Sequence, residues 1–268
     1  MKTAEELRSA LRAIDHRSYP AYKSLVGSWF FGTYTLNIER VQGDPFAAPS
    51  QLSVTVDNRT AGFPVNCWET PWNRTALEDY LLRRFARQAG RFSRQAKGSG
   101  KSGVLAVTTP GQEVLERTDC QVRAGAVTLR FEVGFPANGR TINARELEKI
   151  LFDFLPVCVE QGLLYASAPK GEVEQIIHLA EDQHFIREEL ARLELAAFVA
   201  DGSVLPRESG VSDRSMKNAV PFQAPESMAV ILDLPHRGTV RGMGVRRGIT
   251  LIAGGGYHGK STLLKALE

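Results

Sequence analysis

The sequence has few cysteines and no long apolar run, and both shortages narrow the classes of protein to which it can belong. Its three cysteines, Cys67, Cys120 and Cys158, lie far apart, with no CxxC or Cys/His ligand spacing. This excludes a disulfide framework and indicates no zinc site. No apolar run approaches the ~18 residues of a membrane span. The first segment, MKTAEELRSALRAID, lacks the apolar centre of a signal peptide. We therefore expect a soluble, cytoplasmic protein with no membrane partner.

An excess of charge of one sign is also missing. The chain has 33 Lys and Arg against 30 Asp and Glu, a formal net charge of +3. So small a charge excludes a protein that coats nucleic acid by bulk electrostatics, although it leaves room for a local basic patch. The 43% of hydrophobic and 24% of charged residues are typical of globular proteins. A length of 268 residues allows one large domain or two ordinary ones.

Hydrophobic periodicity predicts an α/β fold, with an N-terminal domain of the α+β kind that mixes strands and helices. Helices are expected at about 3–14, 75–95 and 171–199, and strands at about 28–41 and 113–116. Thr3 and Glu6 have the spacing of a capping box at the start of the first helix.

A segment rich in proline, glycine and serine predicts the main boundary between domains. It covers residues 201–226, DGSVLPRESGVSDRSMKNAVPFQAPE. We expect an N-terminal domain over 1–204, a linker over 205–227, and the beginning of a nucleotide-binding domain over 228–268.

The clearest motif lies near the carboxyl end, where residues 254–261 read GGGYHGKS. They satisfy the phosphate-loop pattern G-x-x-x-x-G-K-[ST]. An apolar strand expected at 248–253 precedes the loop, and a helix expected from Ser261 follows it, which is the order of elements that this motif requires.

Each position of the motif has a chemical reason. Glycines let successive N–H groups turn inward toward phosphate oxygens, and the helix presents its positive end to the same anion. Lys260 would reach the β- and γ-phosphates, and the Ser261 hydroxyl would bind Mg²⁺. The residues predicted to bind nucleotide are Gly254, Gly255, Gly256, Tyr257, His258, Gly259, Lys260, Ser261 and Thr262.

Several segments together resemble one family, the predicted ATPases of the ABC class. They are VQGDPFAAPS at 41–50, FPANGR at 135–140, FVADGSVLPRESGVSD at 198–213, AVPFQAPESM at 219–228 and RGITLIAGGGYHGKSTLLKALE at 247–268. The resemblance implies an α/β N-terminal domain followed by an ABC-type nucleotide-binding domain, with ATP and Mg²⁺ as cofactors. It also implies that the full-length protein forms a homodimer around its nucleotides.

Other parts of that family's active site are not found in this sequence. The signature loop, the acidic strand that binds magnesium and the catalytic glutamate have no counterpart. We therefore predict no catalytic residue in this chain. We expect it to be the N-terminal part of a longer ATPase, or a truncated product of one.

A basic segment suggests a second function. Seven basic residues and no acidic one lie between Arg83 and Lys101. On a helix, Arg83, Arg87, Arg91 and Arg94 would form one stripe. The stripe predicts either a module that binds nucleic acid, RNA or DNA, with the ATPase half as a switch, or a face that is solvated or paired within the fold.

Overall fold

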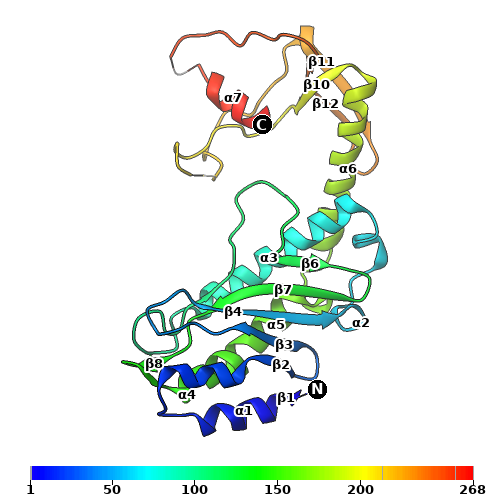
Figure 1. Cartoon of the computed structure of the whole chain (residues 1–268). Coiled ribbons are helices and arrows are strands. Elements are labelled where there is room, and N and C mark those ends of the chain that lie inside the picture. The colour runs from blue at the N-terminus through cyan, green and yellow to red at the C-terminus, as the bar shows by residue number, and fades with distance from the viewer. Residues whose placement is uncertain (1, 213, 257, 268) are drawn as a thin grey trace. The chain divides into compact units, whose positions relative to one another are not determined.

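A computed structural model describes residues 2–212, 214–256 and 258–267 and shows an α/β protein, as predicted (Figure 1). The chain divides into two compact units. The first ends at Glu174 and the second begins at Gln175. Each unit has a sheet of its own, with seven strands in the first and three in the second.

The first unit is built on a mostly antiparallel sheet. Its strands follow the order β1-β2-β3-β4-β7-β5, and β6 also pairs with β7. The short β1 runs parallel to β2, and the other pairs of this sheet are antiparallel. The strands are β1 (Lys2–Thr3), β2 (Gly27–Phe30), β3 (Thr35–Arg40), β4 (Ser50–Asp57), β5 (Leu105–Ala106), β6 (Cys120–Val122) and β7 (Ala126–Val133); β8 (Ala137–Asn138) and β9 (Thr141–Ile142) form a separate pair.

The helices of the first unit are α1 (Ala4–Ala13), α2 (Asn58–Ala61), α3 (Pro71–Phe92), α4 (Ala144–Glu148) and α5 (Leu155–Leu163). The predicted capping box starts α1: the Glu6 N–H donates to Thr3 Oγ1 over 3.2 Å, and the Thr3 N–H donates to Glu6 Oε2 over 2.6 Å. A π-helical segment, Lys149–Phe154, joins α4 to α5. The helical path therefore runs without a break from Ala144 to Leu163.

The core of this unit lies between the sheet and α3, and α5 packs against α3. Phe85 of α3 contacts Phe131 of β7, with ring centroids 5.5 Å apart. At Gly162 of α5, an added Cβ would lie 3.1 Å from the Phe85 Cα. The missing side chain at Gly162 therefore lets the two helices approach closely.

The second unit contains α6 (Glu172–Arg192) from Gln175 on, with β10 (Leu195–Ala200), β11 (Ala229–Leu234), β12 (Gly238–Arg246) and α7 (Lys260–Leu267). Its antiparallel sheet has the order β10-β12-β11. A small core gathers on this sheet, where Val199 and Met243 are buried and Leu263 and Leu267 of α7 pack against them.

The predicted helix over 171–199 is wrong after Arg192. Glu194 takes a left-handed conformation with φ of +55°, which ends the helix. The chain then returns as β10 and pairs with β12, with Val199 opposite Met243. Because β10 belongs to the second sheet, the first compact unit ends earlier than residue 204.

Three predicted strands also differ from the structure. The stretch 28–41 forms two strands, β2 and β3, since Gly32 turns the chain at φ of +83°. Residues 113–116 form no strand. Residues 248–253 form none either, and Ile249 and Leu251 are 104% and 86% exposed. A strand needs a neighbour to satisfy its N–H and C=O groups, and no described strand pairs with this segment.

Candidate phosphate-binding site

The predicted phosphate loop lies in the second unit, immediately before α7. Gly259 has a φ of +76°, a conformation that residues with a side chain rarely adopt. The Leu263 N–H then donates to the Gly259 carbonyl over 2.9 Å, which forms the first helical hydrogen bond of α7. The turn at Gly259 therefore brings the loop to the positive N-terminal end of the helix.

Lys260 closes the loop. Its Nζ donates to the carbonyl oxygens of Gly254, over 2.7 Å, and Gly255, over 2.5 Å. His258 makes a further contact across the loop, where its Nδ1 accepts the Gly255 N–H over 3.1 Å. The predicted residues Gly254, Gly255, His258 and Lys260 thus lie together in one closed turn. Tyr257, also predicted to bind nucleotide, lies outside the described residues.

Ser261 and Thr262 occupy the first turn of α7, and Ser261 is exposed. A hydroxyl at this position is the ligand that phosphate loops offer to Mg²⁺, and the remaining ligands are nucleotide oxygens, water and carboxylates. Ser261 fits that role for one ligand. In the described part of the chain, no group of three or more His, Cys, Asp or Glu side chains is arranged to hold a metal ion.

A cavity of about 320 Å³ adjoins the loop. Most of its wall is apolar, and part of it comes from the linker that precedes β11. The lining residues are Leu205, Pro206, Val220 and Phe222 from the linker, and Ile252, Ala253, His258, Gly259, Lys260, Thr262 and Leu263 from the loop region. A cationic group and helix amides at one end of an apolar cavity suit a ligand with an anionic part and an apolar part.

Sequence reasoning missed the contribution of the linker. Backbone hydrogen bonds hold it to the end of β10: the Gly202 N–H donates to the Phe222 carbonyl over 2.8 Å, and the Phe222 N–H donates to the Ser203 carbonyl over 2.9 Å. A local signal is the pair of apolar residues Val220 and Phe222 in a mostly polar segment. The linker is therefore a wall of the candidate site as well as a connection.

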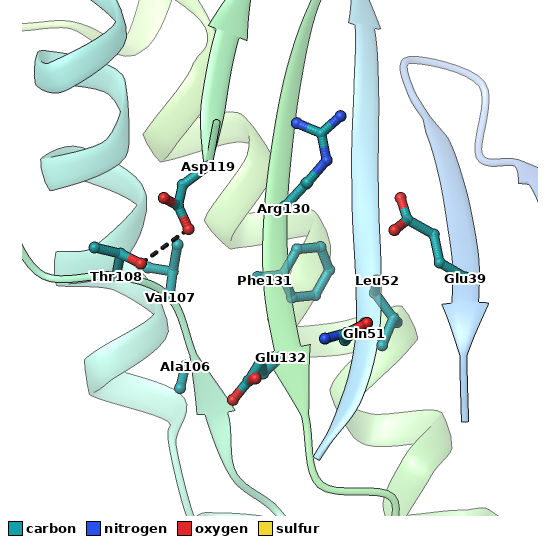
Figure 2. Close-up of a pocket in the computed structure, with 10 residues that line it drawn as sticks. All are labelled: Glu39, Gln51, Leu52, Ala106, Val107, Thr108, Asp119, Arg130, Phe131 and Glu132. Atoms are coloured by element: carbon teal, nitrogen blue, oxygen red, sulfur yellow. Dashed lines mark hydrogen bonds between the residues drawn. The ribbon is translucent and has the colours of Figure 1, made fainter. Parts of the chain in front are cut away.

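Another cavity, of about 470 Å³, lies in the first unit beside β7 (Figure 2). Its charged groups are of both signs, and several are bound to neighbours. Asp119 accepts a hydrogen bond from the Thr108 hydroxyl over 2.8 Å, and Arg130 donates to the Gln121 side chain over 3.0 Å. Glu39 accepts from the Ser53 hydroxyl over 2.7 Å. This cavity has no loop amides or lysine arranged for phosphate.

The predicted basic stripe is not continuous. Arg83 binds Asp79, with its Nε 2.5 Å from Oδ2, and also donates to the Gly111 carbonyl over 2.7 Å. Asp79 is 5% exposed and also binds Arg117 over 2.8 Å. Arg83 is therefore held in a partly buried ion pair and also binds the loop before β6, which it links to α3.

The end of the stripe also departs from the helix. Helix α3 ends at Phe92, and Arg94 follows in a left-handed conformation with φ of +64°. Arg87 and Arg91 remain exposed on α3. The four arginines consequently do not form one helical face, and a nucleic-acid partner stays a prediction.

Comparison with known families gives two matches. Residues 4–166 match a family model described as the N-terminal part of ATPases of the ABC class. Residues 169–268 match the P-loop domain of the ABC ATPases. No curated protein matches the chain. Among the described residues, no helix has both the length and the apolar character needed to cross a membrane.

Proposed function

Since the chain belongs to the ABC-class ATPases, we propose that its loop 254–262 binds Mg-ATP. The triphosphate lies against the loop and the N-terminus of α7, and the base enters the apolar cavity beside it. The observation that carries this proposal is Lys260, which lines that cavity and whose Nζ lies within hydrogen-bonding distance of the Gly254 and Gly255 carbonyls.

The predicted residues divide the binding between them. Loop amides other than that of Gly255, which donates to His258, and the end of α7 supply donors to the phosphate oxygens. Lys260 adds a positive charge at the β- and γ-phosphates, and the Ser261 hydroxyl supplies one ligand to Mg²⁺. Bound Mg²⁺ would neutralise phosphate charge. A Cβ built on Gly256 or Gly259 would meet no atom within 4 Å, so these two glycines leave room for the phosphates to approach the backbone.

We assign binding, and not hydrolysis, to these residues. Phosphoryl transfer needs an acidic group for the metal and a group that orients the attacking water. The described residues that line the cavity include no carboxylate. Homodimer formation stays a prediction that rests on the resemblance, and a partner of RNA or DNA stays one that rests on the basic segment. A cytoplasmic location stays a prediction from the cysteine spacing and from the lack of a signal-peptide or membrane-span pattern in the sequence.

Calorimetric titration of the chain with Mg-ATP tests the proposal. We expect weak binding, because no strand in the described part of the chain pairs with the segment 248–253 to support the loop. Replacing Lys260 by Ala should abolish it, since the loop loses its cation. The matched control is Lys265→Ala, which removes an exposed lysine of the same helix and should bind like the wild type. Equal binding by Lys260→Ala and the wild type would contradict the proposal.

A further inference from the structure

His258 lies across the phosphate loop from its first two glycines. Its Nδ1 accepts the Gly255 N–H over 3.1 Å. A Cβ built on Gly254 would lie 3.3 Å from both Cβ and Nδ1 of His258, and one built on Gly255 would lie 3.3 Å from its Cε1. Gly254 and Gly255, which have no side chains, therefore leave the space that the imidazole ring of His258 occupies.

Lys260 contacts the same end of the loop. Its Nζ binds the Gly255 carbonyl, and His258 binds the Gly255 N–H. The N–H and the C=O of Gly255 are thus both hydrogen-bonded to side chains from the other end of the loop. Lys260 has a second role at the phosphates under the proposed function, whereas the motif sets no residue type at position 258.

We propose that His258 is a positioning residue of the phosphate loop. Its ring holds Gly255 at a fixed distance from the start of α7, so that the loop is already closed before phosphate arrives. A loop fixed in its binding conformation loses less conformational freedom on binding, and this raises affinity without a new contact to the ligand. The effect on affinity rests on the proposed function. The hydrogen bond from the Gly255 N–H to His258 Nδ1, called the brace below, is present without a ligand.

The chemistry of the brace requires an acceptor at one defined position. A neutral imidazole that accepts at Nδ1 carries its proton on Nε2. An asparagine at 258 would place its Oδ1 where Nδ1 lies, because both atoms are bonded to Cγ. His258→Asn should therefore keep the hydrogen bond to Gly255, and His258→Ala should lose it.

The experiment has two readouts on the chain 1–268. The first is hydrogen exchange of the Gly255 amide in the absence of ligand. We expect protection in the wild type and in His258→Asn, and faster exchange in His258→Ala. The control is His184→Ala, which removes an imidazole paired with Glu188 on α6 and should leave the Gly255 amide unchanged. Equal exchange rates in the wild type and His258→Ala would overturn the brace.

The second readout is the affinity for inorganic tripolyphosphate and for Mg-ATP. His258→Ala should weaken both by on the order of fivefold, as expected for one hydrogen bond, because the brace acts on the part of the site that both ligands share. His258→Asn should restore most of the loss. Unchanged or tighter binding by His258→Ala, or no recovery with Asn, would overturn the positioning role. Absence of binding by the wild type would instead refute the proposed function. The exchange rate of the Gly255 amide would still show whether the hydrogen bond to His258 exists.

Discussion

Consecutive carboxylates on α3 show how strongly the surroundings of one residue set its contribution to stability. Asp79 is 5% exposed and lies between the guanidinium groups of Arg83 and Arg117. Glu78 is 6% exposed, and its Oε1 accepts the Val122 N–H over 2.7 Å. Burial raises the pKa of Glu78, and the hydrogen bond from Val122 offsets this only in part.

We expect Glu78→Gln to stabilise the protein at neutral pH. The glutamine keeps an acceptor for Val122 but carries no buried charge. The pKa of Glu78 is higher in the folded state than in the unfolded chain, so the ionised form disfavours folding and protonation removes that cost. The increase in the free energy of unfolding of Glu78→Gln over the wild type should therefore be complete at pH values above the pKa of Glu78 in the folded state. It should vanish as the pH falls below the pKa of Glu78 in the unfolded chain. Thermal unfolding at several pH values measures it, and a gain independent of pH would contradict this explanation.

At the scale of elements, the linker offers a sharper test than the loop because, under the proposed function, it would contact the base and not the phosphates. Phe222 of the linker lines the cavity. Phe222→Ala should weaken Mg-ATP binding by on the order of tenfold, about 1.4 kcal/mol of lost apolar contact. Its affinity for tripolyphosphate should not change. Titration with both ligands measures the difference, and an equal loss for the two would indicate a damaged loop and no base site.

Elements with a local signal were predictable from the sequence. Thr3 and Glu6 mark the start of α1 because both partners of the capping box lie within four residues of sequence. The glycines and Lys260 likewise mark a closed loop by their spacing alone. The motif itself predicts a nucleotide phosphate, and the resemblance to a family adds that the nucleotide is ATP.

Elements set by distant contacts were not predictable. The end of α6 depends on a left-handed Glu194, a residue type with no preference for that conformation. The next residues then form β10 because β12 is there to pair with them. Conversely, Ile249 and Leu251 have the pattern of a strand but lack a described partner. Phe222 reaches the candidate site only through tertiary hydrogen bonds between the linker and the end of β10.

At the scale of the whole molecule, the two units have separate cores, and the first should fold alone. It contains the seven-stranded sheet and the helices that pack on it. A domain of ~150 residues buries about two thirds of the surface of its unfolded chain, which suffices for independent stability. Residues 1–174 should therefore show one cooperative thermal transition in circular dichroism. A broad, gradual loss of signal would show that this unit depends on the rest of the chain.

The central claim is that the loop before α7 binds the phosphates of ATP, and amide chemical shifts test it most directly. Two-dimensional ¹H–¹⁵N spectra of the chain should be recorded during a titration with Mg-ATP. Binding as proposed predicts the largest shifts at Gly255, Gly259, Lys260 and Ser261, smaller shifts at Phe222, and none of these in Lys260→Ala. Shifts confined to the first unit, or equal shifts in Lys260→Ala, would contradict the account.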